Sequence, residues 1–378
     1  MKKILPFFIV GLLLLSKNGL SLEDSLRVVI KKNIKSCRLL VKGDYRVQLP
    51  FTEEELDRGR NLKTDISVDN SKGIRIGGSY YNVFAVEVLP QKDGAIYVDS
   101  RPYRGKMRFI KKDGSLAVVN IISLEDYLKG VLEYEVAHWW PMESLKAQAV
   151  AARTYALYMK EMNKNKSYDL TSDVLSQVYG GKLGERWRIK RAVLSTEGLI
   201  LMYGGNVLPT FYHSTCGGHT DDVKHLWKME TPPLGGVSCD FCRYSKHYRW
   251  DKKIKVKDFK AAFSKSGYNL NNIDKIFVKE RYGNDYVKTI EIFADSKEYL
   301  ISAKEFRSIL GADIIRSRLF ALDKIDGVIS IRGYGWGHGI GLCQWGAYGM
   351  SKKGYDFREI LEYYYPGSEI KKIIWDEK

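Results

Sequence analysis

The stretch SLEDYLKGVLEYEVAHWWPMESLKAQAVAARTYALYMKEM, from Ser123 to Met162, decides the fold of the central part of the chain. Ser123 can cap a first helix, and Asp126, three residues later, completes a variant of the capping box. Pro141 is tolerated at a first helical position and opens a second helix, which no Gly or Pro interrupts before Met162. Apolar residues recur at helical spacing in both segments, so the stretch predicts two packed helices.

Acidic and aromatic residues fill the elbow between the two predicted helices: Glu133, Glu135, His138, Trp139 and Trp140. A carboxylate beside indole rings is poorly solvated, which raises its pKa and can turn it into a general acid. On the residues alone, the alternative is that Glu135 only caps the helix or forms a salt bridge. Glu133, two residues away, is expected to be a solvated surface residue.

Four longer motifs carry a resemblance to a known family. They are GVLEYEVAHWWPMESLKAQAVAARTYA at 130–156, QVYGG at 177–181, FYHSTCGGHT at 211–220 and GWGHGIGLCQWGA at 335–347. In this order they are similar to the stage II sporulation protein D family (SpoIID/LytB), and together they extend over most of the mature chain.

The resemblance implies a peptidoglycan lytic transglycosylase that cleaves the MurNAc-GlcNAc β-1,4 bond, with Glu135 as the catalytic residue. In this reaction one acid protonates the glycosidic oxygen and then acts as base toward the muramic acid 6-hydroxyl, giving a 1,6-anhydro end without water. A lone glutamate suits this route better than the paired carboxylates of ordinary glycosidases. The family usually has Glu-Met-Pro where this chain has Glu135-Val136-Ala137.

The resemblance also sets the expected partners. The substrate is expected to be glycan strands stripped of their stem peptides. LytB-type members imply an alternative, in which the protein is a non-catalytic, wall-binding enhancer of an N-acetylmuramoyl-L-alanine amidase. The physiological process, sporulation or other cell-wall remodelling, stays open.

Four residues have the spacing of a zinc site. Cys216, His219, Cys239 and Cys242 follow the pattern C-x2-H-x19-C-x2-C, which suits a tetrahedral structural zinc. His213 is a further candidate, since the family motif includes it. The alternative is a disulfide such as Cys216–Cys242, which an oxidising compartment favours. Cys37 and Cys343 are expected to be small buried hydrophobes.

Glycines alternate with aromatic and polar residues from Arg332 to Met350. Glycine lets backbone approach a ligand closely, although the same residues also serve tight internal packing. We expect this segment to close a sugar groove opposite Glu135. The predicted substrate-binding residues are Trp140, Gln177, Tyr179, His213, Trp336, His338, Gln344 and Trp345.

Residues 1–21 resemble a secretory signal peptide, with Lys2 and Lys3 before an apolar run and Gly19-Leu20-Ser21 as a cleavage site. The expected location is therefore extracytoplasmic, in the periplasm or the cell wall. The alternative is an uncleaved membrane anchor, because only the cleavage step separates the two.

The chain is basic, with 61 Lys+Arg against 45 Asp+Glu and a formal net charge of +16. Outside the cytoplasmic membrane this charge suits the cell wall or a membrane surface. It does not point to nucleic acid, because the basic residues are dispersed and no binding motif accompanies them.

The order of predicted elements gives an α+β fold class. We expect a signal peptide (1–21), a β-rich scaffold (22–120), a catalytic core (121–249), a mixed α/β segment (250–331) and a Gly-rich groove segment with a C-terminal helix (332–378). Within the scaffold, the polar stretch from Asp57 to Asp69 is expected to be a loop or a short helix.

Overall fold

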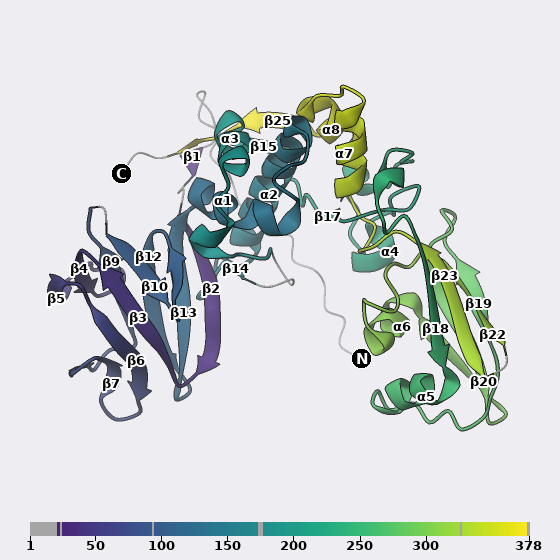
Figure 1. Cartoon of the computed structure of the whole chain (residues 1–378), viewed down its shortest axis with the longest axis horizontal. Coiled ribbons are helices and arrows are strands. Elements are labelled where there is room, and N and C mark those ends of the chain that lie inside the picture. The colour runs from purple at the N-terminus through teal and green to yellow at the C-terminus, as the bar shows by residue number, and fades with distance from the viewer. Residues whose placement is uncertain (1–20, 23–24, 93, 173–176, 326, 376–378) are drawn as a thin grey trace.

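The computed structural model describes residues 21–22, 25–92, 94–172, 177–325 and 327–375. It confirms the predicted α+β fold class, with a β-rich N-terminal region. Figure 1 shows this region at one end of the molecule, the helices α1, α2, α3, α7 and α8 in the middle, and a second strand-rich region at the other end. Apart from Ser21, the predicted signal peptide lies outside the described residues.

The N-terminal region consists of two sheets that share one core. The seven-stranded sheet has the order β14 (Leu170–Thr171), β2 (Ser25–Ile34), β13 (Ser115–Ser123), β12 (Lys106–Lys112), β9 (Ala85–Pro90), β4 (Asp44–Gln48), β5 (Glu55–Arg60). The six-stranded sheet has the order β11 (Arg101–Tyr103), β10 (Ala95–Val98), β3 (Ser36–Lys42), β6 (Lys63–Asp69), β7 (Gly73–Ile76), β8 (Ser79–Tyr81). Alternating residues of both sheets, such as Leu39, Ile66 and Phe109, are fully buried between them.

One prediction in this region is wrong. Residues Asp57 to Asp69, expected to be a loop or a short helix, belong mostly to strands β5 and β6. Strand β5 is an edge strand and is mostly exposed, so it has no apolar alternation. In β6 only Ile66 is buried. Because strand patterns are recognised by their buried face, these two strands carry too weak a signal.

The helical core starts where β13 ends. Strand β13 runs to Ser123, whose side chain accepts a hydrogen bond from the backbone N–H of Asp126, and α1 (Leu124–Glu135) begins at the next residue. Helix α2 (Met142–Met162) follows Pro141, and both predicted helices are therefore present. Helices α3 (Trp187–Ser195) and α8 (Phe357–Tyr364) and strands β15 (Leu199–Tyr203), β16 (Asn206–Val207) and β25 (Glu369–Lys372) complete this part.

The alanine-rich face of α2 lets other helices approach it closely. Ala149, Ala152 and Ala156 are fully buried there. Helix α7 (Gln344–Lys352), from the Gly-rich segment, packs against α2 together with α3 and α8. The C-terminal part of the chain thus returns to helix α2, as Figure 1 shows.

A further region with its own hydrophobic core is formed by residues 249–334, which lie in the sequence between strand β16 and helix α7. It contains the sheets β18 (Arg249–Lys255), β23 (Val328–Tyr334), β22 (Phe320–Ile325) and β19 (Ile273–Arg281), β20 (Val287–Ala294), β21 (Lys297–Ser302). Helices α5 (Val256–Ser264) and α6 (Ala303–Leu310) pack on them. We call this unit the second domain. Throughout the described part of the chain, no helix is both long and apolar enough to cross a membrane.

Candidate functional site

Glu135 is the last residue of α1 and its side chain is partly exposed. The backbone N–H of Val178 donates a hydrogen bond to Glu135 Oε1 at 3.3 Å, and the side chain of Gln344 forms a second one. Burial nevertheless dominates and raises the pKa of Glu135 to about 7. A carboxylate at a helix C-terminus also faces the negative end of the helix dipole. The side chain is therefore suited to hold a proton at neutral pH.

A tight loop presents the Val178 amide to Glu135. Gly180 N–H donates to Gly130 O at 3.1 Å, and a Cβ at Gly130 would lie 2.6 Å from the ring of Tyr179. Only a glycine on α1 allows the ring to pack so closely. Tyr179 itself is buried, and its hydroxyl donates to Asn120 Oδ1 at 2.8 Å. This corrects the predicted substrate contact of Tyr179, which instead anchors the loop to β13.

Gln177 is also buried rather than facing a substrate. Its amide Nε2 donates to Ala152 O at 3.1 Å and to the Tyr212 hydroxyl at 2.9 Å. The predicted substrate contact is therefore corrected to a positioning role, in which Gln177 fixes the Tyr212 ring beside Glu135. The negative charge of Glu135 helps to raise the pKa of Tyr212, after burial, which places the two groups close together.

One aromatic cluster flanks the site where the elbow meets α7. Trp140 packs on Trp345 at 4.9 Å and on Tyr348 at 5.2 Å between ring centroids. Trp140 is buried, Trp345 and Tyr348 are partly exposed, and Trp139, beside Tyr348, is 60% exposed. Trp345 and Trp139 therefore offer flat surface for a sugar ring, and Trp140 supports them.

A second aromatic cluster surrounds Tyr212 and Phe211 and was missed by sequence reasoning. The ring centroid of Tyr155, on α2, lies 6.3 Å from that of Tyr212 and 6.0 Å from that of Phe211. Phe211 stacks on Trp227 with 4.4 Å between ring centroids. Trp227 ends the short helix α4 (Lys224–Trp227). Phe211 and Tyr212 belong to the FYHSTCGGHT motif, of which only the histidines and the cysteine were predicted to be functional residues. Their place in that motif was the available signal.

Burial keeps both histidines of the predicted groove neutral, because it lowers the pKa of each. His338 Nδ1 accepts from the Ile340 N–H at 3.0 Å, so Nε2 carries the proton and donates to Tyr212 O at 2.8 Å. Burial lowers the pKa of His338 well below its usual value and that of His213 to about 4. His213 is buried, with Nδ1 donating to Ile340 O at 3.1 Å, which corrects its predicted substrate contact to a scaffold role.

The Gly-rich segment packs against the 211–216 segment backbone to backbone. Strand β17 (Tyr212–His213) pairs in parallel with β24 (Leu342–Cys343), and Thr215 bridges Trp336. A Cβ at Gly341 would lie 2.1 Å from Phe211 O, and the backbone φ of Gly341 is +67°. The packing alternative thus accounts for this glycine. Trp336 contacts His247 and Arg316.

The pairing of β17 with β24 also assembles four thiols. Cys216, Cys239, Cys242 and Cys343 are buried, and their sulfur atoms all lie within 4.8 Å of one another. The Sγ atoms of Cys216 and Cys242 are 3.6 Å apart, and all the described cysteines are free. Four thiolates around a zinc at 2.3 Å would be about 3.8 Å apart, so the donor set fits a tetrahedral metal site. These four residues could therefore hold one metal ion.

The fourth corner is Cys343 and not His219, which corrects the predicted ligand set. His219 packs its ring against Tyr286 at 5.3 Å. Cys343, predicted to be a small buried hydrophobe, is buried, but its sulfur atom belongs to the cluster. Its Sγ also accepts from the N–H groups of Cys216 at 3.2 Å and of Gly346 at 3.3 Å, so it caps α7. Hydrogen bonds, first from Cys216, lower the pKa of Cys239.

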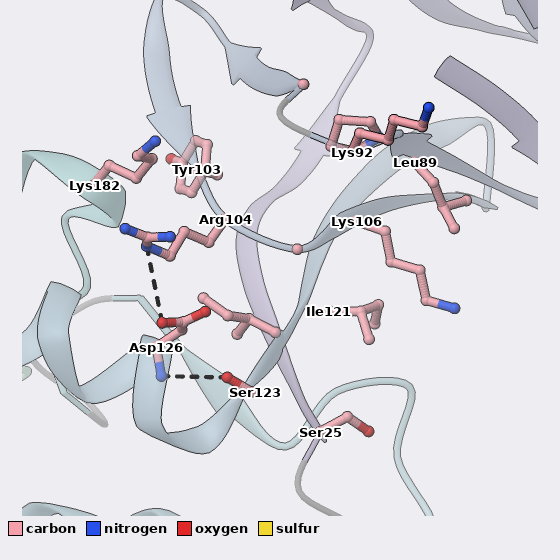
Figure 2. A pocket seen from close by; sticks show the side chains of 14 residues that line it. Ser25, Leu89, Lys92, Tyr103, Arg104, Lys106, Ile121, Ser123, Asp126 and Lys182 are labelled. Atoms are coloured by element: carbon pink, nitrogen blue, oxygen red, sulfur yellow. Dashed lines mark hydrogen bonds and ion pairs between the residues drawn. The ribbon is translucent and has the colours of Figure 1, made fainter. Parts of the chain in front are cut away.

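A pocket of about 450 Å³ lies at the start of α1, whereas Glu135 is at the end of this helix. Figure 2 shows the side chains that line the pocket. Ser123 and Asp126 line it together with Arg104, Lys106 and Lys182. Arg104 forms an ion pair with Glu185, with 2.5 Å between Nε and Oε1, and its Nε lies 3.9 Å from Asp126 Oδ1. A 12-residue helix is about 18 Å long, so this pocket does not share the chemistry of Glu135.

The sequence of this chain matches two family models and several known proteins. The family model described as stage II sporulation protein matches residues 112–203, and a domain of unknown function (DUF8618) matches 240–341. An uncharacterised protein of Brachyspira hyodysenteriae is 34% identical over 331 residues, covering 87% of this chain and 88% of the relative.

Two named relatives belong to Bacillus species. Stage II sporulation protein D of Bacillus amyloliquefaciens is 30% identical over 270 residues, covering 67% of this chain and 76% of the relative. A protein named amidase enhancer, of Bacillus subtilis, is 26% identical over 297 residues, covering 64% of this chain and 40% of that protein. The matched residues 112–203 contain Glu135, Gln177 and Tyr179. The chain belongs to the stage II sporulation protein D (SpoIID/LytB) family.

Proposed function

We propose that this protein is an exported lytic transglycosylase that cleaves the MurNAc-GlcNAc β-1,4 bond of peptidoglycan strands. The observation that carries the proposal is Glu135, a partly exposed carboxyl group whose pKa is raised to about 7. At neutral pH such a group is protonated in a large share of molecules and still basic enough to take a proton back. Both halves of the reaction need this property.

The proton leaves Glu135 and returns to it. Glu135 gives its proton to the glycosidic oxygen as the C1–O bond breaks, which frees the 4-hydroxyl of the leaving sugar. The muramic acid O6 then bonds to C1, and its proton goes to the Glu135 carboxylate. No water is consumed, and the acid is restored for the next cycle.

A single catalytic carboxylate agrees with the surroundings of Glu135. Glu133 is held by His138 Nδ1 at 2.8 Å and by Arg186 at 3.6 Å, and so it is engaged elsewhere. The two aromatic clusters supply stacking surfaces for sugar rings near the acid. A polysaccharide held between such platforms is oriented for attack, which supplies much of the rate.

The four-thiol site is proposed to hold a structural zinc. A zinc there would supply no chemistry at the acid, since all four donors are protein thiolates and a closed site has no open position. Its role would be to fix the start of α7, because Cys343 directly precedes Gln344. Gln344 would thereby be held against Glu135.

A second candidate function is that of an amidase enhancer. A relative bearing that name supports it, as do the exposed rings of Trp139, Tyr244 and Tyr134, which suit a protein or wall contact equally well. In this case Glu135 would be retained for packing, and turnover of glycan would not depend on it.

The deciding experiment digests purified, denuded glycan strands with wild type, Glu135→Gln and Glu133→Gln. We expect Glu135→Gln to lose about 10²–10⁴-fold in release of 1,6-anhydro ends, measured by mass spectrometry, while Glu133→Gln keeps most activity. Because the poorly solvated carboxylate destabilises the folded state at pH values above its pKa of about 7, Glu135→Gln should melt no lower than wild type at pH 8. Equal activity of wild type and Glu135→Gln would reject the enzyme and favour the enhancer.

A further inference from the structure

A cationic pocket lies where the second domain meets the Gly-rich segment. It has a volume of about 330 Å³ and is lined by α6 residues, by Leu226 of α4 and by Gly337 and His338. Its charged lining residues are Lys304, Arg307 and Arg318, and no carboxylate is among the described lining residues. A cavity of this size holds a small polar group, such as a sugar substituent.

The positive charge in this pocket is only partly compensated. Arg318 donates to the buried carboxylate of Asp221, which accounts for one charge. Arg307 donates to two backbone carbonyls, at Ile315 (2.8 Å) and Arg316 (3.3 Å), and Lys304 is exposed and forms no ion pair within the described chain. Burial and the neighbouring charge of Arg318 lower the pKa of Arg307, as expected for two cations brought together.

One buried donor in this lining has no protein partner. Arg318 is 4% exposed, and its Nε–H is unpaired among the described residues. A buried, charged donor without an acceptor is costly, and a bound anion would relieve the cost. The lining therefore combines directional donors with excess positive charge, which is the pattern expected for an anion site.

The pocket is held in a fixed position relative to the core. Asp221 accepts from Arg318, from Asn284 Nδ2 at 2.6 Å and from His225 Nδ1 at 2.7 Å. The ring of Tyr282 stacks on His225 at 3.7 Å between centroids. Two of these residues belong to the core and three to the second domain, so the network fastens the domain beside the groove.

A continuous aromatic path leads from Glu135 to this pocket. Tyr155 and Tyr212 adjoin Glu135, Phe211 contacts Tyr155, and Trp227 stacks on Phe211. Trp227 in turn contacts His338, which lines the pocket, at 5.3 Å. Three ring-to-ring contacts thus link the surroundings of the acid to the pocket, a reach that suits neighbouring units of one strand.

We propose that this cationic pocket is a subsite for an anionic oxyacid group, a carboxylate or a phosphate, that a bound glycan strand carries near the bond cleaved at Glu135. The inference rests on the proposed function for its substrate. A muramic acid without stem peptide bears a free carboxylate, so a carboxylate in the pocket would select stripped strands. A phosphate substituent on a wall polymer offers the same chemistry from a second source.

The chain offers a closely matched pair of variants for the test. Lys304 is the second residue of α6, and Lys257 is the second residue of α5 in the same domain. Both are exposed, but only Lys304 lines the pocket. An acidic residue is favourable in the first turn of a helix, so Lys304→Glu and Lys257→Glu should both fold.

Binding is measured by titration calorimetry on full-length protein that carries Glu135→Gln, so that no probe is cleaved. The probes are stripped glycan strands with free carboxylates, the same strands with the carboxylates converted to neutral amides, and a glycerol phosphate oligomer. We expect Lys304→Glu to lower the affinity for an anionic probe about tenfold more than Lys257→Glu does. Neither substitution should change the affinity for the amidated strands. If Lys304→Glu lowers the affinity for the free-carboxylate strands alone, the group bound is the carboxylate. If it lowers the affinity for the glycerol phosphate oligomer alone, the group bound is the phosphate.

Equal effects of the two substitutions on both anionic probes would overturn the proposal. So would amidated strands that bind as tightly as the free carboxylates and with the same dependence on Lys304. Product analysis of the wild type runs in parallel. Absence of anhydro ends there would reject the transglycosylase without affecting the binding result, so the two failures can be told apart.

Discussion

The carboxyl group of Glu135, at the last position of α1, is hydrogen bonded by the side chain of Gln344, at the first position of α7. The two residues come from the first and last of the four family motifs. Gln344 is buried, so its amide has few alternatives to this partner. Its hydrogen bond lowers the pKa of Glu135, while the larger effect of burial raises it. Gln344 therefore tunes the acid as well as orienting it.

This relationship predicts the pH dependence of turnover. An acid with a pKa of about 7 is protonated below that pH, so kcat/KM should fall as the pH rises through 7. Gln344→Ala removes a bond to the charged form, so the pKa should rise further and the fall should move to higher pH. Rate profiles of the two proteins between pH 5 and 9 check this. A fall at the same or a lower pH in Gln344→Ala would contradict the assignment.

The metal site gives a second prediction, which separates the ligand set of the structure from that of the sequence pattern. Protein purified without chelator should carry about one zinc per chain, measured by elemental analysis. Cys343→Ser should lose the metal as completely as Cys216→Ser, because both sulfur atoms belong to the cluster. His219→Ala and Cys37→Ser should keep it. Retention in Cys343→Ser with loss in His219→Ala would restore the original pattern, and metal-free protein without free thiols would establish the disulfide.

The aromatic platform gives a third prediction. Trp139 is 60% exposed and touches the Trp140, Trp345 and Tyr348 cluster at its edge. Trp139→Ala should weaken binding of glycan strands about tenfold, near 1.4 kcal/mol, with little change in melting temperature. Phe51→Ala is the matched control, since Phe51 is 91% exposed in the turn between β4 and β5 of the N-terminal region. Equal affinities of the two variants would show that strands do not stack on Trp139.

Much of the fold could be predicted from local patterns. The helices α1 and α2 could be predicted because their start signals and apolar spacing are encoded within a few residues, as at Ser123 and Pro141. The strands β5 and β6 were not, because their register comes from neighbouring strands rather than from their own polar residues. Pairing with the neighbouring strands β4 and β3 therefore defines β5 and β6, although their own residues show little apolar alternation.

The site divides in the same way. Glu135 could be proposed from its elbow and its motif, but the roles of Gln177 and Tyr179 could not, because motif membership does not tell a contact from a support. Cys343 entered the thiol cluster only through the pairing of β17 with β24, which no spacing rule reveals. The second domain, with its cationic pocket, gave only a mixed pattern of elements in the sequence.

Arg153 shows how a motif residue can be essential without touching a substrate. Its side chain is fully buried, and it donates to Glu125 Oε1 at 2.7 Å and Oε2 at 2.8 Å, to Leu199 O at 3.1 Å and to Val193 O at 3.3 Å. The arginine therefore joins α2 to α1, to the end of α3 and to β15. It fixes the angle between the helices that carry Glu135 and Tyr155.

We accordingly predict that Arg153→Met destabilises the protein by about 3–5 kcal/mol, because it leaves the Glu125 carboxylate without its partner in a nearly buried place. Lys164→Met, which breaks an exposed pair with Glu161, should cost no more than about 1 kcal/mol. Urea unfolding of both variants measures the difference. The double substitution Arg153→Met with Glu125→Met should recover part of the loss, since it removes the unpaired charge. If the double variant were as unstable as the sum of its two single variants, the arginine would act through packing alone, and the ion pair would not be what joins the helices.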